Sequence, residues 1–371
     1  MIPVFDPIIG EEEILEVTNA LRKGEISGSF GKYIEQFENE FSKFVGCKYG
    51  IAVTSGTAAL HLAVDAAGVK AGDEVLVSAS TNIATALAVY HNNAVAVPVD
   101  SENITWNLDL DLIESLITPK TKAIIPVHLF GHPVDMDRLM SIANKHDIMV
   151  IEDCAESHGA TVRKKMTGSF GQMACFSFYA NKIITTGEGG MIVTNDQKLA
   201  DRLKLLRNLA FTTPRFWHET AGYNFRMTGY QAAMGVAQMK KINTFIDGKR
   251  KMAETYNKYL SQAEHLQLPA ELEWAKNVYW MYGITVKSGN KSTRDGLMAH
   301  LKNAGIDTRT FFCPMNQQPF LISQKGFRKV NCPVADSIWE RGLYLPSSVN
   351  LQEEQIEFIC TQIKKFFSSK A

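Results

Sequence analysis

The sequence predicts an α/β fold with a mainly parallel sheet, followed by a smaller α+β part. From about Tyr49 onward, short apolar runs alternate with longer helical patterns. The apolar runs are nearly continuous, as in strands that helices cover on both faces. After about residue 278 the rhythm changes to isolated strands, proline-containing loops and a last amphipathic helix. The 371 residues suffice for one large and one smaller domain, which we expect at 1–245 and 246–371.

The expected elements of the first part follow one another as strand and helix. Strands are expected at 50–54, 74–78, 95–100, 123–128, 149–152, 174–178 and 191–194. Helices are expected at 57–67, 84–91, 110–117 and 136–146. A longer helical pattern starts after Met227 and runs through 231–242 to Leu260, with the domain boundary near 244–250. The C-terminal part should contain a strand at 278–286 and helices at 293–304 and 353–367.

The composition excludes several classes of protein. Lys and Arg together number 39, as do Asp and Glu, so the net charge is zero. No global field attracts nucleic acid or an anionic membrane, and we expect neither as a partner. The six cysteines form no Cys-x-x-Cys pair, and no apolar run approaches the roughly 18 residues of a membrane span. The N-terminus also lacks a basic stretch followed by an apolar one, so we expect a cytoplasmic protein.

The segment around Lys182 carries the strongest chemical signal. Lys182 follows an apolar strand and precedes the run Thr-Thr-Gly-Glu-Gly-Gly, whose small residues allow a close approach of backbone and ligand. A lysine in a desolvated pocket has a lowered pKa and becomes a nucleophile toward aldehydes. Taken alone, the same pattern also fits a solvated lysine on a glycine-rich loop.

Asp153 is the second candidate, at the C-terminal end of the strand expected at 149–152. Open α/β sheets bind ligands at that end of their strands. A carboxylate there can keep a pyridine nitrogen protonated, which makes the ring an electron sink. The alternative role is a helix N-cap. Because Lys182 lies one strand later, we favour a joint site for the two residues.

The segment Thr54-Ser55-Gly56-Thr57 is the third candidate, at a strand-to-helix junction. The hydroxyl groups of Ser55 and Thr57, together with the N–H groups at the helix start, would make a phosphate site. The Gly-x-x-x-x-Gly-Lys pattern of a P-loop is absent. By itself Ser-Gly-Thr marks only the start of a helix. Its value comes from supplying the anion site that the other two candidates require.

Together these segments resemble the DegT/DnrJ/StrS aminotransferases over essentially the whole chain. The resemblance is carried by Thr-Ser-Gly-Thr-Ala-Ala-Leu, Glu-Asp-Cys-Ala-Glu, Gly-Ser-Phe-Gly, Ser-Phe-Tyr-Ala-Asn-Lys and Gly-Tyr-Asn-Phe-Arg-Met. It implies fold type I of the pyridoxal-phosphate enzymes, with a large domain around a mainly parallel, seven-stranded type of sheet. It also implies pyridoxal 5'-phosphate as cofactor and a homodimer with a shared active site.

The resemblance also implies a role for each matching residue. Lys182 would form the Schiff base and move protons, and Asp153 would contact the pyridine nitrogen. Glu156 would lie near the ring hydroxyl and Ala155 under the ring. The residues expected to contact the cofactor are Ser55, Gly56, Thr57, Asn82, Asp153, Ala155, Glu156, Ser177 and Lys182, with Asn224 reaching the phosphate of the neighbouring subunit.

The implied reaction moves an amino group from L-glutamate to a nucleotide-linked 4-keto-6-deoxy sugar of the GDP-4-keto-6-deoxymannose type, for amino sugars of surface polysaccharide. Arg215, Arg309 and Lys325 are candidate partners of the diphosphate, and His218 and Asn316 are candidate sugar contacts.

The chain departs from the family pattern at Asn82, where an aromatic residue usually stacks on the cofactor, and at Asn316, where a Pro-x-His stretch is common. These departures leave alternatives open. One is a different reaction with the same cofactor: an oxidase, a dehydratase or an aminotransferase for a non-nucleotide keto compound. The dehydratase branch of the family has histidine in place of Lys182. Another alternative is a regulatory protein without turnover, which would gain nothing from keeping Lys182 and Asp153. No metal site is expected at His128 and His132, whose surroundings lack the carboxylates typical of zinc sites.

Overall fold

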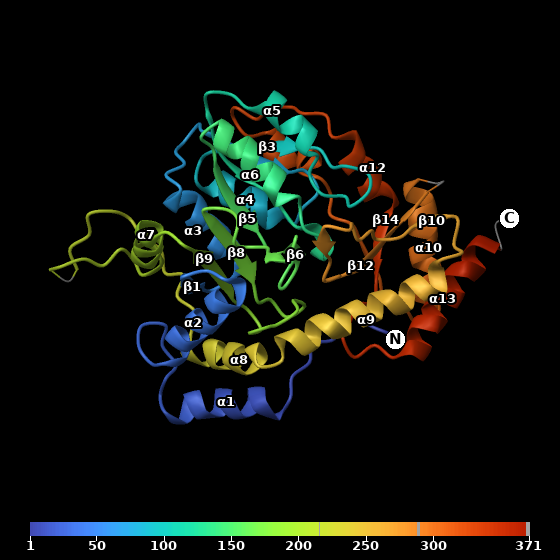
Figure 1. Ribbon diagram of the computed structural model, residues 1–371, viewed down its shortest axis with the longest axis horizontal. Coiled ribbons are helices and arrows are strands. Elements are labelled where there is room, and N and C mark those ends of the chain that lie inside the picture. Colours follow the sequence, from blue (N-terminus) through green and yellow to red (C-terminus); the bar gives the residue numbers. More distant parts are fainter. Residues whose placement is uncertain (215, 288–289, 369–371) are drawn as a thin grey trace.

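The computed structural model describes residues 1–214, 216–287 and 290–368, and a seven-stranded sheet lies at its centre (Figure 1). The strand order is β1-β9-β8-β5-β4-β2-β3. Neighbouring strands pair in parallel from β3 to β8, while β9 runs antiparallel to both β8 and β1. The predicted mainly parallel sheet is therefore confirmed, with one reversed strand. The bounds are β1 Tyr49–Val53, β2 Glu74–Ser78, β3 Val95–Val99, β4 Thr121–Ile125, β5 Met149–Asp153, β8 Met173–Ser177 and β9 Gly190–Thr194.

Helices cover both faces of this sheet because the side chains of each strand alternate between two apolar cores. On β1, Ile51 and Val53 belong to one core and Ala52 to the other. The first core packs the sheet against α3 (Gly56–Ala66), α4 (Ile83–His91) and α7 (Gln197–Arg207). On the other face, α2 (Tyr33–Val45) and α8 (Gly229–Met239) cover one half of the sheet. The helix α6 (Met136–Lys145) covers the other half.

A second, four-stranded antiparallel sheet has the order β10-β12-β14-β13. Its core is formed with α9 (Ile242–Leu260), α10 (Lys291–Asn303) and α13 (Glu353–Ser368). Helix α9 runs from beneath the large sheet to this second core (Figure 1). The strands are β10 Leu266–Gln267, β12 Tyr282–Val286, β13 Arg309–Thr310 and β14 Gly342–Leu345.

The remaining elements are short or lie at the surface. Helix α1 (Glu11–Arg22) packs on α8. A small three-stranded sheet has the order β11-β6-β7. The other elements are β6 Thr161–Val162, β7 Lys165–Met166, β11 Ala275–Lys276, α5 Ile113–Leu116, α11 Pro319–Ile322, α12 Pro333–Arg341, and the 3₁₀ turns Leu110–Leu112, Leu129–Gly131 and Met315–Gln317.

The structure corrects three sequence predictions. The long helical pattern is two helices, because α8 ends at Met239 and α9 begins at Ile242. The helix predicted at 110–117 is a 3₁₀ turn followed by the one-turn helix α5. The strand predicted at 278–286 begins only at Tyr282, because Tyr279 has a φ of 49° and turns the chain.

The N-terminus packs against the C-terminal part of the chain. Ile2 forms a parallel bridge with Ile306, and the carbonyl of Val4 accepts a hydrogen bond from the N–H of Ser347. The domain division at 245 and 246 stays a prediction. All six cysteines are free thiols, and five of them are buried. In the described part of the chain, no helix is both long and apolar enough to cross a membrane. A cytoplasmic location stays a prediction.

Candidate active site

A cavity of about 250 Å³ opens at the C-terminal ends of the parallel strands. Nine of the ten residues expected to contact a cofactor line it. They come from the start of α3, the start of α4, the end of β5 and the loop after it, and the end of β8 and the loop after it. The nine are Ser55, Gly56, Thr57, Asn82, Asp153, Ala155, Glu156, Ser177 and Lys182.

Lys182 lies on the loop between β8 and β9, where its N–H donates to the carbonyl of Tyr179 over 2.9 Å. The lysine is partly buried rather than solvated, and its Nζ lies 3.9 Å from the centre of the Trp280 ring. Burial lowers the pKa of Lys182 from its ordinary value, and the nearby carboxylates of Glu156 and Asp153 oppose that shift. A lysine with a lowered pKa has a larger share of neutral amine, which is the nucleophilic form.

Asp153 ends strand β5 and is buried at 4% exposure. Its Oδ2 accepts a hydrogen bond from the hydroxyl of Thr85 at 2.8 Å, and its Oδ1 accepts one from the N–H of Ala155 at 3.1 Å. No helix starts at this point in the described structure, so the N-cap alternative is wrong. Burial raises the pKa of Asp153, while the Thr85 and Ala155 hydrogen bonds and the charge of Lys182 lower it.

Helix α3 begins at Gly56, directly against the end of β8. Ser55 caps the helix, because its hydroxyl accepts a hydrogen bond from the N–H of Ala58 at 3.1 Å. The first N–H groups of any helix have no partner within the helix, and the helix dipole makes this end attractive to anions. Ser55, Gly56, Thr57 and Ser177 all line the cavity, so hydroxyl and N–H donors converge on its wall.

Glu156 is the second buried carboxyl group of the cavity, at 3% exposure. It accepts a hydrogen bond from the N–H of Phe130 at 2.8 Å. Burial raises the pKa of Glu156, and the charge of Lys182 opposes this shift. A carboxyl group that is readily protonated can share a proton with a neighbouring hydroxyl or amine.

Asn82 takes a structural role besides lining the cavity. Its Oδ1 accepts a hydrogen bond from the N–H of Ala84 at 3.0 Å and so caps helix α4. Asn82 stands where the family pattern usually has an aromatic residue, and the sequence pattern indicates no replacement for it. In the structure, four aromatic side chains from distant segments line the cavity instead: Tyr179, Trp280, Phe312 and Tyr344. Three of them lie on separate segments of the C-terminal part, which explains why local patterns did not identify them.

The other predicted contacts do not line this cavity. Asn224 and His218 are exposed, and the Nδ1 of His218 lies 2.9 Å from the carbonyl of Leu209. Asn316 lines a different hollow, where its amide donates to Asp336 at 3.0 Å. Lys325 is exposed. Arg215 lies outside the described residues.

Arg309 does not line the cavity either, but its neighbour in the second sheet does. It pairs across the sheet with Tyr344, one of the lining residues. Side chains directly opposite on neighbouring strands lie on the same face. Its guanidinium group lowers the pKa of the Tyr344 hydroxyl, although burial raises that pKa overall to about 12. Arg309 therefore places a positive charge beside Tyr344 of the cavity wall, although it also forms an ion pair with Asp307.

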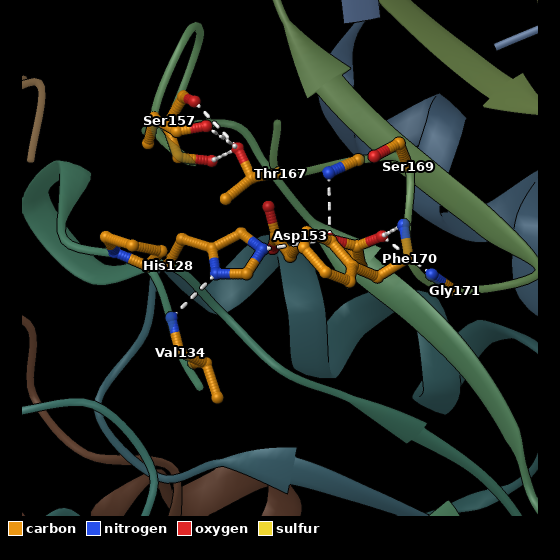
Figure 2. A network of polar contacts seen from close by, with 12 residues as sticks. His128, Val134, Asp153, Ser157, Thr167, Ser169, Phe170 and Gly171 are labelled. Carbon is orange, nitrogen blue, oxygen red and sulfur yellow. Dashed lines mark hydrogen bonds and ion pairs between the residues drawn. The ribbon is translucent and has the colours of Figure 1, made fainter. Parts of the chain in front are cut away.

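Beside Asp153, a buried polar network fixes the adjacent loop (Figure 2). The carboxylate of Glu152 accepts hydrogen bonds from the N–H groups of Gly168, Phe170 and Gly171, each at 2.8 Å. The Nε2 of His128 lies 3.3 Å from the same carboxylate. The Gly-Ser-Phe-Gly motif is thus a loop whose backbone N–H groups close around the buried side chain of Glu152.

The same network contains a possible set of metal ligands, His128, Glu152 and Cys154. The N–H of Val134 donates to the Nδ1 of His128 at 3.1 Å, which makes Nδ1 the acceptor and Nε2 the protonated nitrogen (Figure 2). Neither nitrogen of His128 then offers a lone pair to a metal. Burial also raises the pKa of Cys154 well above its ordinary value, so the thiol stays protonated.

The sheet, with a lysine and a carboxylate at the C-terminal ends of its strands, defines an aminotransferase-type α/β enzyme of fold type I. The chain belongs to the DegT/DnrJ/EryC1/StrS aminotransferase family, whose model matches residues 7–364. The family predicted from the motifs is therefore confirmed.

Named relatives cover the full length of the chain. A GDP-perosamine synthase of Escherichia coli O157:H7 is 40% identical over 370 residues, which are 100% of this chain and 99% of the relative. A GDP-perosamine synthase of Vibrio cholerae is 36% identical and covers 99% of this chain and 100% of its own. Among solved structures, a putative sugar aminotransferase from Streptococcus pneumoniae in its PMP form matches with a TM-score of 0.94 at 26% identity, over 100% of both chains.

Proposed function

We propose that this aminotransferase uses pyridoxal 5'-phosphate to transfer an amino group from L-glutamate to a nucleotide-linked 4-keto-6-deoxy sugar, in the biosynthesis of amino sugars for surface polysaccharide. The observation that carries the proposal is one cavity lined by Lys182, Asp153 and the N-terminus of α3. Relatives named GDP-perosamine synthase support a nucleotide sugar as the acceptor.

The residues of the cavity fit this cofactor at three separate points. Gly56 lets the start of α3 lie directly against Ser177, because a β-carbon at position 56 would lie 2.7 Å from the β-carbon of Ser177. Asp153 is a buried carboxylate that a positive ring nitrogen would compensate. Lys182 is a partly buried amine with a lowered pKa, as a nucleophile toward an aldehyde requires.

When bound, the cofactor supplies an electron sink for the carbon that loses its proton. Lys182 would bind the aldehyde and carry the proton between the donor's α-carbon and the cofactor. Asp153 would keep the ring nitrogen positive. Glu156 would face the ring hydroxyl, and Ala155 would pack under the ring. The hydroxyl groups of Ser55, Thr57 and Ser177 and the first N–H groups of α3 would hold the phosphate.

We also propose a homodimer in which Asn224 serves the neighbouring cavity. Asn224 is exposed and outside the cavity of its own chain. Helix α1 and the loop after it expose large apolar side chains: Ile14 at 53%, Leu15 at 56%, Leu21 at 55% and Phe30 at 63%. An apolar surface of this kind suits a second copy of the chain.

The test starts with the purified protein and pyridoxal 5'-phosphate. The protein should turn yellow, and borohydride should bleach the band and fix the cofactor on the peptide that contains Lys182, as mass spectrometry would show. Glutamate with a panel of keto-sugar nucleotides should then yield 2-oxoglutarate. A colourless protein that binds no cofactor would overturn the proposal.

The panel also separates the alternative functions. Amination of a non-nucleotide keto compound alone would replace the proposed acceptor. Cofactor binding without 2-oxoglutarate from any acceptor would replace transamination by another reaction of the same cofactor, or by a regulatory role.

A further inference from the structure

Lys249 is a fully buried lysine outside the cavity wall. It lies on α9 among the residues that face the core, at 0% exposure. The buried residues of α9 recur at intervals of three and four, and Lys249 takes one of these positions between Ile246 and Met252. An apolar residue would be expected at this position, so the burial of a lysine amine there has to be explained by its contacts.

The contacts of Lys249 are two backbone carbonyls. Its Nζ donates to the carbonyl of Trp280 at 2.9 Å and to the carbonyl of Ser347. The Phe5 ring is 5.5 Å away. Within the described residues, no carboxylate pairs with Lys249. Burial lowers the pKa of Lys249 to about 7.

These two carbonyls belong to neighbouring segments of the second sheet. Trp280 comes just before β12, and Ser347 comes just after β14. The two strands pair with each other, and the N–H of Tyr282 donates to the hydroxyl of Ser347 at 2.9 Å. The hydrogen bonds of Lys249 thus connect α9 to the start of β12 and the end of β14.

Trp280 connects this point to Lys182. Its indole N–H donates to the carbonyl of Asn181 at 2.7 Å, and its ring lies 3.9 Å from the Nζ of Lys182. Lys182 and Lys249 also border one small hollow between the N-terminal segment and α9. The backbone carbonyl of Trp280 is therefore bound by Lys249, while the indole ring of Trp280 lies over the amine of Lys182.

We propose that Lys249 is a positioning residue, which holds Trp280 so that the indole ring covers the amine of Lys182 and excludes water from it. This inference rests on the proposed role of Lys182 as the reacting lysine. A positioning role explains why the buried amine of Lys249 has two backbone carbonyls as its partners. Both carbonyls would lack this hydrogen-bond donor if Lys249 were replaced by an apolar residue.

The consequence is a measurable change in Lys182. Desolvation is the largest cause of its lowered pKa. If the indole ring shifts and water enters, the pKa of Lys182 should rise toward its ordinary value.

The experiment measures Lys182 in the cofactor-free protein. Acetylation of single lysines by acetic anhydride, followed over pH by mass spectrometry, gives the pKa of Lys182. We expect Lys249→Met to raise that pKa by about one unit. The control Lys251→Met, at an exposed position of the same helix, should leave it unchanged. A folded Lys249→Met protein with an unchanged Lys182 pKa overturns the inference.

A second variant decides the matter if Lys249→Met does not fold. Trp280→Phe keeps the backbone carbonyl that Lys249 binds but loses the donor to Asn181 and part of the ring. It should raise the pKa of Lys182 as well, and an unchanged value also overturns the inference. Cofactor uptake by the wild-type protein is scored separately. Failure of uptake counts against the proposed function, whereas failure of the pKa shift counts against the role of Lys249.

Discussion

A β-carbon on Gly56 would lie 2.7 Å from the β-carbon of Ser177, so the first residue of α3 touches the last residue of β8. This contact brings the helix N-terminus and the strand end to one wall of the cavity. A side chain at position 56 would separate them and disturb the wall that we propose holds a phosphate group.

The first prediction concerns Gly56. Gly56→Ala should lower the free energy of unfolding by about 1–3 kcal/mol through overpacking. It should also raise the Kd for pyridoxal 5'-phosphate by about tenfold, a loss of about 1.4 kcal/mol of binding. Cofactor titration and thermal melting measure the two effects. Gly10→Ala is the control, because a β-carbon there meets its nearest neighbour at 3.5 Å. Equal cofactor affinity in Gly56→Ala and wild type would contradict the prediction.

The second prediction concerns Lys182. Lys182→Ala should lower transamination by at least roughly 10²- to 10⁴-fold, because the proposed proton carrier is lost. The fold should persist, since the lysine is only partly buried and forms no ion pair in the described structure. Lys198→Ala, at an exposed position, should keep full activity. Circular dichroism measures whether the fold persists, and steady-state rates measure the activity. Turnover near the wild-type rate in a folded Lys182→Ala protein would rule out the assignment.

The central sheet was predictable because its strands are short, apolar and bounded by turn residues. Strand β2 begins and ends where its sequence pattern does, at Glu74 and Ser78. Helix α2 was not assigned, although Phe37, Phe41 and Val45 are buried at helical spacing. The gap between α8 and α9 was not visible, because apolar periodicity continues through both helices. Two-residue strands such as β13 carry too few residues for a pattern.

The site was predictable where neighbouring residues in the sequence form it. Lys182, Asp153 and the start of α3 each follow a strand, and parallel strands bring their C-terminal ends to one edge. Trp280 was missed because it follows the turn at Tyr279, and its contacts with Lys249 and Asn181 come from other elements. Long-range contacts of this kind have no local signature.

The third prediction concerns the pH dependence of the cofactor-free protein. Burial raises the pKa of Asp153 in the folded state above the ordinary value of an aspartate, 3.8. Between the pKa values of Asp153 in the unfolded and the folded state, the folded protein therefore binds more protons than the unfolded protein. The stability that Asp153 contributes falls as the pH rises above about 3.8. Asp153→Asn should remove this fall in stability. The free energy of unfolding of the variant at neutral pH should equal or exceed that of the wild type. Urea titrations from pH 4 to 8 measure it, with the exposed Asp147→Asn as control.

The same substitution should act in the opposite direction on catalysis. The amide of Asp153→Asn can still meet Thr85 and Ala155, but it carries no charge to keep a ring nitrogen protonated. Transamination should fall sharply while the protein remains folded. An Asp153→Asn protein that is both less stable at neutral pH and fully active would contradict both parts.

The last prediction compares two buried glutamates of one segment. Glu152 accepts three backbone hydrogen bonds at 2.8 Å each, whereas Glu156 accepts one. In Glu152→Gln the amide group must face at least one N–H donor, which leaves that buried donor without a partner at a cost of about 1–3 kcal/mol. The pKa of Glu156 is raised by burial, so a neutral amide should be tolerated in Glu156→Gln. Thermal and urea unfolding should show a clear loss of stability for Glu152→Gln and little change for Glu156→Gln. Equal losses would mean that the closed loop around Glu152 is not the stabilising feature.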